Sequence, residues 1–187
     1  MSKFSLLSTL LAASLMFQAC SDNNKDTAQD VNSILSTNEF VLTGLDNKQY
    51  IIEKAPQGFK LKNMQGKVLI LDIFATWCPP CQAEASHLAS LQKKYKDDLV
   101  IIGITVENNI PNTKLKNFRE LHGADYVLVN STENTRIIDA VAEKLHLGRD
   151  FGIPLMAMYK DGKLVNYYQG ATEEEFIQSD IKKALGK

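Results

Sequence analysis

From about residue 38 to its end, the chain alternates strand-like and helix-like patterns of apolar positions. Residues 68–74 and 99–106 are nearly continuous apolar runs, as expected for strands that are buried on both faces. Between them, residues 81–95 place apolar side chains at helical spacing with charges on the opposite side. The pattern therefore predicts a strand, an amphipathic helix and a second buried strand.

The flanking segments extend this alternation. Apolar segments at 40–42 and 49–52 surround a turn sequence and predict a hairpin. The other predicted elements are a helix at 112–122, a strand at 126–129, a helix at 137–147 ending at Gly148, a hairpin of strands 155–159 and 164–168, and a last helix opened by a capping box at Thr172–Glu175. This order predicts a three-layer α/β/α fold with a mixed central sheet.

The N-terminal segment has the features of an export signal. Residues 4–19 are apolar, but a membrane span needs roughly 20 apolar residues. The segment ends at Phe17-Gln18-Ala19-Cys20, which resembles a bacterial lipoprotein processing box with Cys20 as the acylated residue. Phe17 is too large for an ordinary signal cleavage site, although simple secretion and an uncleaved anchor remain as alternatives. All three place the domain outside the cytoplasm.

Three regions follow from this interpretation. Residues 1–19 are expected to be a lipoprotein-type signal peptide. The stretch 20–37 is mostly polar and has no hydrophobic period, which predicts a flexible tether. Residues 38–187 are expected to form the folded domain.

Composition excludes several classes of function. Lys and Arg total 21 against 22 Asp and Glu, so the chain lacks the charge excess of a nucleic-acid binder. Three cysteines are too few for a disulfide scaffold or a four-cysteine zinc site, and the three histidines are scattered. We expect no metal site, no nucleic-acid partner and no cofactor other than a redox-active cysteine pair. Lipidation of Cys20 would leave one such pair.

That pair is Cys78-Pro79-Pro80-Cys81, at the junction of the buried strand and the amphipathic helix. The first sulfur lies at the helix N-terminus, where free N–H groups and the helix dipole favour a thiolate. Proline fixes φ at the start of a helix, so Pro79 and Pro80 stiffen this turn and tune its redox chemistry. Neither proline has an N–H, so backbone donors to the Cys78 sulfur must come from Cys81 and beyond.

These residues resemble the TlpA/ResA-like exported thiol–disulfide oxidoreductases of the thioredoxin superfamily. The resemblance covers about residues 38–187. It rests on the run Val68–Cys81, on Gly152-Ile153-Pro154, on Lys160–Lys163 and on Gly170. The N-terminal hairpin and an added strand–helix unit around 107–129 also resemble that subgroup. Leu155–Met158 departs from the family pattern, which often has Thr and aromatic residues after the proline.

The resemblance implies roles for the residues of this motif. Cys78 corresponds to the partly exposed attacking thiol and Cys81 to the buried resolving thiol. Pro154 corresponds to the family's cis-proline, which lets the Ile153 backbone pair with an extended substrate. An ordinary trans-proline is the alternative. Trp77 is expected to shield one side of the dithiol, or else to be a core aromatic residue.

Two carboxylates are further candidates for catalysis. Asp72 interrupts an apolar strand, where burying a lone carboxylate is costly, and it matches the buried acid that takes the proton of the resolving thiol. Burial would raise its pKa toward neutrality; an Asp hydrogen-bonded at the sheet end is the alternative. Glu84 lies one helical turn beyond Cys81 and shares its face. It resembles an acidic residue near the family's dithiol, or else it lies on a solvated helix face.

The sequence thus predicts a membrane-tethered periplasmic thiol–disulfide oxidoreductase, expected to be a monomer. The resemblance favours a reductant of exported proteins, for example of apocytochrome c cysteines, recharged by a membrane electron donor of the DsbD/CcdA type. A disulfide oxidant or isomerase remains an alternative within the fold. A haem- or metal-handling binding module is the alternative from another class.

Overall fold

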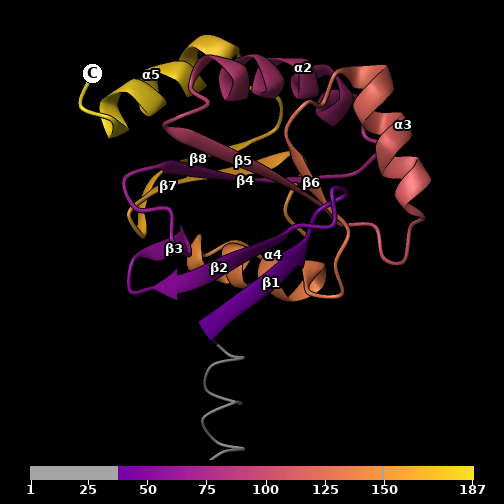
Figure 1. Cartoon of the computed structure of the whole chain (residues 1–187), viewed down its shortest axis with the longest axis horizontal. Coiled ribbons are helices and arrows are strands. Elements are labelled where there is room, and N and C mark those ends of the chain that lie inside the picture. The colour runs from indigo at the N-terminus through magenta and orange to yellow at the C-terminus, as the bar shows by residue number, and fades with distance from the viewer. Residues whose placement is uncertain (1–37, 149) are drawn as a thin grey trace, which may run out of the picture.

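The centre of the molecule is a five-stranded mixed sheet (Figure 1). The computed structural model describes residues 38–148 and 150–187, so the predicted signal peptide, tether and Cys20 lie outside the described residues. The strands are β4 (Val68–Phe74), β5 (Leu99–Thr105), β6 (Val127–Val129), β7 (Leu155–Lys160) and β8 (Lys163–Gln169). Their order is β6-β5-β4-β7-β8, with β7 antiparallel to β4 and to β8 and the other pairs parallel. The predicted mixed sheet is confirmed.

Layers cover both faces of this sheet. Helices α2 (Pro79–Lys94), α3 (Asn112–His122) and α5 (Glu174–Ala184) lie on one face. The other face is covered by α4 (Asn134–Lys144) and a small antiparallel sheet of β1 (Glu39–Thr43), β2 (Gln49–Ala55) and β3 (Gly58–Leu61). The three-layer α/β plan with an N-terminal hairpin is therefore present.

Strand β4 divides the core into two clusters. All seven of its residues are buried. The even-numbered apolar residues pack under α2, α3 and α5, and the odd-numbered ones pack toward α4 and the small sheet. Alternate side chains of a strand point to opposite faces, so Asp72 points into the layer below α2.

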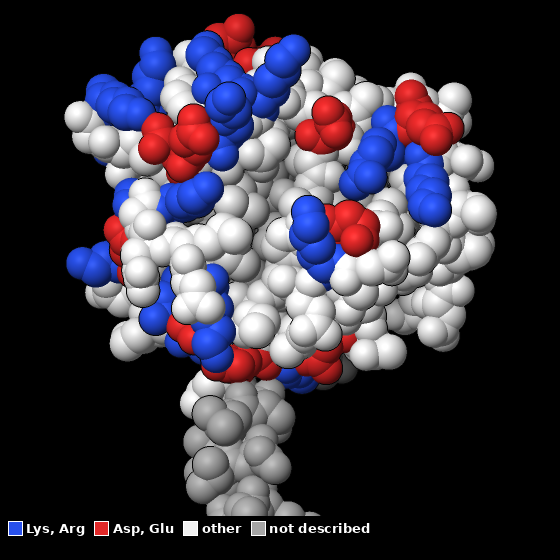
Figure 2. Space-filling view, viewed as in Figure 1, with Lys and Arg blue, Asp and Glu red and all other residues white. Residues whose placement is uncertain are grey.

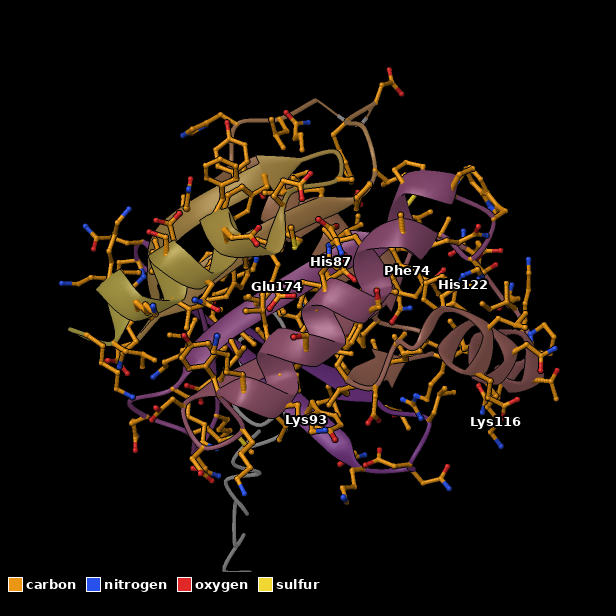
Figure 3. The ribbon with its side chains drawn as sticks, turned by 90° about the horizontal axis from the view of Figure 1, so that it is seen from above. Phe74, His87, Lys93, Lys116, His122 and Glu174 are labelled. Atoms are coloured by element: carbon orange, nitrogen blue, oxygen red, sulfur yellow. A yellow bond between two sulfur atoms is a disulfide. The ribbon has the colours of Figure 1, made fainter. Side chains whose placement is uncertain are left out.

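Helix α2 is fixed between its two neighbours. Viewed from above, it lies between α5 and α3 (Figure 3). On one side Ser90 donates a hydrogen bond to Glu174 of α5 at 3.0 Å. On the other, the Phe118 ring of α3 packs on Phe74 at the end of β4, with centroids 4.8 Å apart. The start of α2 is held beside the end of β4 by the Gln82 side chain, which donates to the Thr76 carbonyl at 2.8 Å.

Both predicted hairpins are present. Positive φ angles at Asp161 (48°) and Gly162 (83°) form the tight turn between β7 and β8. Strand β3 was not predicted, because four residues without a clear alternation give too weak a signal. Its first residue, Gly58, approaches the Tyr159 ring so closely that a Cβ there would lie 2.6 Å from a ring carbon.

Three helix boundaries differ from the prediction. Helix α2 begins at Pro79, since proline is compatible with the first helical positions. Helix α4 spans Asn134–Lys144 and ends at Leu145, so Gly148 is not its cap. The predicted capping box is absent: α5 follows Glu173 with no side-chain capping bond. The backbone N–H of Thr172 donates instead to Glu84 at 2.9 Å.

The surface is mixed in charge. On the face shown in Figure 2, basic and acidic side chains are interspersed. Several charged side chains of the described residues form ion pairs, such as Lys60 with Glu53 at 2.9 Å. Among the helices within residues 38–148 and 150–187, none has the length and apolar character needed to cross a membrane.

Candidate active site

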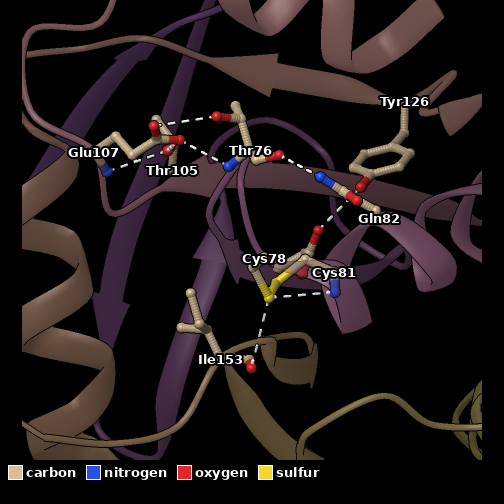
Figure 4. Close-up of a disulfide and its surroundings, with 9 residues drawn as sticks. Thr76, Cys78, Cys81, Gln82, Thr105, Glu107, Tyr126 and Ile153 are labelled. Atoms are coloured by element: carbon tan, nitrogen blue, oxygen red, sulfur yellow. Dashed lines mark hydrogen bonds between the residues drawn. A yellow bond between two sulfur atoms is a disulfide. The ribbon is translucent and has the colours of Figure 1, made fainter. Parts of the chain in front are cut away.

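The first turn of α2 carries a disulfide between Cys78 and Cys81 (Figure 4). Cys78 is the N-cap of the helix, and Pro79 and Pro80 occupy its first two positions. The Cys81 N–H donates to the Cys78 sulfur at 3.3 Å. As predicted, the first backbone donor available to this sulfur comes from Cys81.

The loop before β7 faces the disulfide. The Ile153–Pro154 peptide bond is cis, which confirms the expectation and makes the trans alternative wrong. The Ile153 carbonyl oxygen lies 3.8 Å from the Cys78 sulfur. The structure therefore brings Cys78 together with Ile153 and Pro154, although 75 residues separate Ile153 from Cys78.

The cysteine pair is more enclosed than expected. Cys78 is only 2% exposed and Cys81 3%, so the expectation of a partly exposed Cys78 is wrong. The reason is that both side chains join the core cluster under α2, against which Ile153 also packs. Trp77 is 63% exposed, which excludes the core-aromatic alternative. The dithiol is thus recessed, and the residue before it is an exposed aromatic.

Asp72 and Glu84 are both buried in the layer that contains the disulfide, at 2% exposure each. Asp72 Oδ2 accepts a hydrogen bond from the Tyr126 hydroxyl at 3.1 Å. Glu84 Oε1 accepts from the Thr172 N–H at 2.9 Å. The other oxygen of each carboxyl, Asp72 Oδ1 and Glu84 Oε2, has no partner among the described residues. A solvated helix-face Glu84 is therefore excluded. The hydrogen bond from Tyr126 is also what the alternative of an Asp hydrogen-bonded to a neighbour expects, so burial and this bond do not by themselves assign a catalytic role to Asp72.

Burial raises the pKa of both carboxyl groups toward neutral pH. It raises the pKa of Asp72 to about 7, against the opposing effect of the Tyr126 hydrogen bond. Burial, and next the charge of Asp72, raise the pKa of Glu84 to about 8, and the Thr172 hydrogen bond opposes them. Each carboxyl can therefore gain or lose a proton at the pH where thiols exchange.

Sequence reasoning missed Glu107, which follows β5. Its carboxylate accepts hydrogen bonds from the Thr76 N–H at 2.7 Å, the Thr76 hydroxyl at 3.1 Å and the Thr105 hydroxyl at 3.2 Å. Lys114 forms an ion pair with it at 2.5 Å. Burial opposes ionisation, but the bonds from Lys114 and Thr76 prevail and hold the pKa of Glu107 below its ordinary value.

Glu107 therefore holds the turn that leads into Trp77. On the other side of this turn, the Gln82 side chain donates to the Thr76 carbonyl at 2.8 Å. One available signal was that Glu107 follows the carboxyl end of β5, beside the parallel strand that carries Asp72. Tyr126 had no such signal, because 54 residues separate it from Asp72.

The chemistry of this region is that of a cysteine pair with nearby proton-exchanging groups. Within residues 38–148 and 150–187, no group of three or more His, Cys, Asp or Glu side chains is arranged to hold a metal ion. A dithiol at a helix start, opposite a cis-proline and on a mixed sheet of this order, is typical of thioredoxin-like thiol–disulfide oxidoreductases. The chain is an enzyme of that class.

Comparisons with known proteins define it further. The chain belongs to the Redoxin family, whose model matches residues 23–185, and it is a TlpA/ResA-like member of the thioredoxin superfamily. It is 28% identical over 148 residues to the thiol-disulfide oxidoreductase ResA of Bacillus thuringiensis (strain Al Hakam), which covers 77% of this chain and 73% of ResA. ResA of Bacillus subtilis (strain 168) is 27% identical over 112 residues, or 58% of this chain and 60% of that protein.

The fold is also found among solved structures. A thiol:disulfide interchange protein of the thioredoxin family from Chlorobium tepidum TLS superimposes with a TM-score of 0.63. The superposition covers 80% of this chain and 94% of that protein, at 24% sequence identity. This likeness supports the thioredoxin-like fold.

Proposed function

We propose that this enzyme is a membrane-tethered reductant of disulfides in exported proteins. Its substrates in this proposal are cysteine-containing proteins on the periplasmic side of a bacterial membrane, with apocytochrome c as an example that the ResA resemblance implies. The direction of electron flow depends on how strongly the environment stabilises the Cys78 thiolate.

The surroundings of the Cys78 sulfur carry this proposal. A strong oxidant of this fold, such as DsbA, owes its potential to a stabilised reduced form. Here one backbone N–H, that of Cys81, donates to Cys78, because two prolines precede it in the helix. The contact on the other side is the Ile153 carbonyl oxygen, whose partial negative charge opposes a thiolate. Poor stabilisation of the thiolate favours the disulfide state and hence reduction of substrates.

The reaction is a two-step exchange. The Cys78 thiolate attacks a substrate disulfide, so one substrate sulfur leaves as a thiolate and a mixed disulfide forms with the other. Cys81 then gives its proton to a carboxylate, and its sulfur attacks Cys78. The mixed disulfide breaks, the second substrate sulfur leaves as a thiolate, and the Cys78–Cys81 disulfide is restored. Two electrons pass from the enzyme to the substrate.

Side chains of the site receive roles in this scheme. Asp72, held near a pKa of 7 by burial, is the proposed acceptor of the Cys81 proton. Glu84 is the neighbouring acid that modulates it. Ile153 and Pro154 offer backbone to an extended substrate segment beside Cys78, and the exposed Trp77 contacts that segment. No cofactor other than the cysteine pair is required.

The N-terminal region supplies the location in this proposal. Acylation of Cys20 anchors the chain, residues 20–37 act as the tether, and a membrane donor of the DsbD/CcdA type returns the electrons. Cys20→Ala is expected to release the protein from membranes or to block its processing. Unchanged retention and mature mass would instead favour an uncleaved anchor.

The equilibrium potential of the Cys78–Cys81 couple tests the direction. Purified domain is equilibrated in glutathione and dithiothreitol buffers, and the reduced fraction is read by alkylation and mass spectrometry. We expect a value nearer to that of thioredoxin, about −270 mV, than to that of DsbA, about −120 mV. A potential near the DsbA value would overturn the proposal and favour the oxidant or isomerase alternative.

A further inference from the structure

Tyr126 connects a distant part of the chain to the buried acid. It precedes β6, in the unit inserted between β5 and α4, and its side chain is buried. Its hydroxyl donates to Asp72 Oδ2 at 3.1 Å, across the intervening strand β5. In Figure 4 the Tyr126 ring enters with its hydroxyl directed toward the side of the disulfide. This is the one hydrogen bond that Asp72 receives from the side chains of the described residues.

A glycine makes the approach of Tyr126 possible. Gly103 of β5 is the register partner of Asp72 on β4. A Cβ at this glycine would lie 3.0 Å from the Tyr126 Cε2 atom and 2.8 Å from a methyl of Leu128. The Tyr126 ring therefore occupies space that any larger residue at position 103 would fill.

The backbone of Tyr126 is also held. The Arg119 guanidinium donates to the Tyr126 carbonyl at 2.9 Å and to the Ala124 carbonyl at 3.3 Å. Gly103 of β5 therefore leaves room for the Tyr126 ring, and Arg119 of α3 fixes the Tyr126 backbone by hydrogen bonds. Such double support is typical of a side chain that positions another group.

We propose that Tyr126 is a positioning residue for disulfide exchange: it holds Asp72 by Oδ2 and leaves Oδ1 as the oxygen that takes the Cys81 proton. This inference rests on the proposed role of Asp72. In the step concerned, the Cys81 S–H proton moves to Asp72 Oδ1 and the Cys81 sulfur attacks Cys78. The bond from Cys78 to its partner breaks, and the partner leaves as a thiolate.

Asp72 has few charged neighbours, so its hydrogen bond from Tyr126 has a large effect on the pH dependence of the resolution step. Helix α2 presents Cys81 and Glu84 on this side, with the half-buried His87 one turn further on. Strands β5 and β7 present Gly103 and Met156, which carry no charge. Arg119 contacts the backbone of Tyr126. The segment before α5 contributes only the backbone N–H of Thr172, which donates to Glu84.

The Tyr126 hydroxyl is a constant donor in this environment. Burial, and then the charge of Asp72, raise the pKa of Tyr126 well above its ordinary value, so the phenol keeps its proton throughout the working range. A hydrogen bond to a carboxylate favours its charged form. Tyr126 thus keeps Asp72 available as a base at neutral pH, in competition with the burial that protonates it.

The test follows resolution of a mixed disulfide with glutathione. Reduced full-length protein is mixed with oxidised glutathione, quenched with acid, and the Cys78–glutathione adduct is followed by mass as a function of pH. For Tyr126→Phe we expect the pH at which the resolution rate is half-maximal to rise by about one unit. This is the size expected for loss of one hydrogen bond to a carboxylate. The rate at pH 7 should fall about fivefold and recover in alkali.

Tyr159→Phe is the matched control. Tyr159 is also buried, in the other core cluster, and its hydroxyl has no hydrogen-bond partner among the described residues. The Tyr159→Phe variant should leave the pH profile of the resolution rate unchanged. A Tyr126→Phe profile that superimposes on the wild type would overturn the inference.

Asp72→Asn separates the inference from the role on which it rests. In that background, adding Tyr126→Phe should move the pH midpoint no further, because the group that Tyr126 positions is gone. An equal shift in both backgrounds would overturn the inference, since Tyr126 would then act through Glu84 or the fold. Wild-type resolution by Asp72→Asn alone would overturn the proposed role of Asp72. Because glutathione replaces the client, none of these results depends on the direction of electron flow.

Discussion

Two groups of acids lie near the cysteine pair, the half-buried Glu107 and the buried Asp72 and Glu84, and they differ both in burial and in how many donors they receive. Glu107 accepts from two groups of Thr76, from Thr105 and from Lys114. Asp72 and Glu84 each accept one bond and each keep an oxygen without a partner. The pKa of Glu107 is lowered, whereas burial raises that of Asp72 to about 7 and that of Glu84 to about 8.

This difference shows that burial and hydrogen-bond donors together decide what a carboxylate does. A carboxylate saturated with donors stays charged and acts as a clamp, here on the turn before Trp77. One that receives a single donor in an apolar layer is destabilised as an anion and exchanges protons near neutrality. Glu107 follows β5 and Asp72 lies on the neighbouring strand β4, so the depth of burial and the number of donors separate the clamp from the proposed proton carrier.

The largest effect is expected from removing the thiol that supplies the proton. Cys81→Ala should abolish turnover and accumulate mixed disulfides through Cys78, because attack remains while resolution is lost. Non-reducing gels and mass spectrometry of captured adducts measure this. Cys78→Ala is the control and should capture nothing. Capture by Cys78→Ala but not by Cys81→Ala would show that the roles are reversed.

Asp72→Asn tests the sparsely bonded acid. We expect resolution of mixed disulfides at neutral pH to slow by about 100-fold, the lower end of the typical contribution of general acid–base catalysis. Attack by Cys78, measured by alkylation of the reduced protein, should change less. Wild-type resolution from neutral to mildly alkaline pH would contradict this prediction.

The same substitution should stabilise the fold in a pH-dependent way. The folded pKa of Asp72 is raised from 3.8 to about 7, so the native carboxyl destabilises the fold increasingly as pH rises between these values. Asp72→Asn should therefore raise the free energy of unfolding by about 1–3 kcal/mol near pH 8 and by little near pH 4. Urea unfolding at the two pH values measures this, and a larger gain at pH 4 would contradict it.

Glu107→Gln should show the opposite sign. The folded pKa of Glu107 is lowered from 4.5, so its charge stabilises the fold above that pH, and this is lost as pH falls through the folded pKa. We expect a loss of about 1 kcal/mol at pH 7 that shrinks below about pH 4. Reaction of Cys78 should slow a few-fold because the turn loosens. An unchanged unfolding midpoint at pH 7 would show that Glu107 is not a clamp.

The smallest effect is expected for Glu84→Gln. The amide keeps an oxygen for the Thr172 N–H but removes the negative charge that Glu84 gains beside Asp72 as the pH rises through its pKa of about 8. The resolution profile should therefore move to lower pH by less than one unit, with little change in the maximal rate. A shift to higher pH would show that Glu84 supports proton transfer rather than opposing the charge of Asp72.

Local patterns in the sequence were sufficient for most of the fold. The continuous apolar run of β4 and the helical spacing that follows it fixed the position of the cysteine pair, because these signals lie within neighbouring residues. The missed strand β3 and the shifted bounds of α4 show the limit. Four-residue strands and helix ends carry little periodicity, so packing decides them.

At the site, the sequence by itself was sufficient to single out Cys78, Cys81, Asp72 and Pro154 as candidates, because each occupies a motif position or breaks an apolar run. Only the tertiary structure decided the burial of Cys78 and of Glu84, since exposure depends on what packs against a side chain. It also decided the partners: Thr172 gives its N–H to Glu84, and Tyr126 reaches Asp72 past Gly103. Burial and hydrogen bonds between residues far apart in the chain together set the protonation of the site, and neither has a local pattern in the sequence.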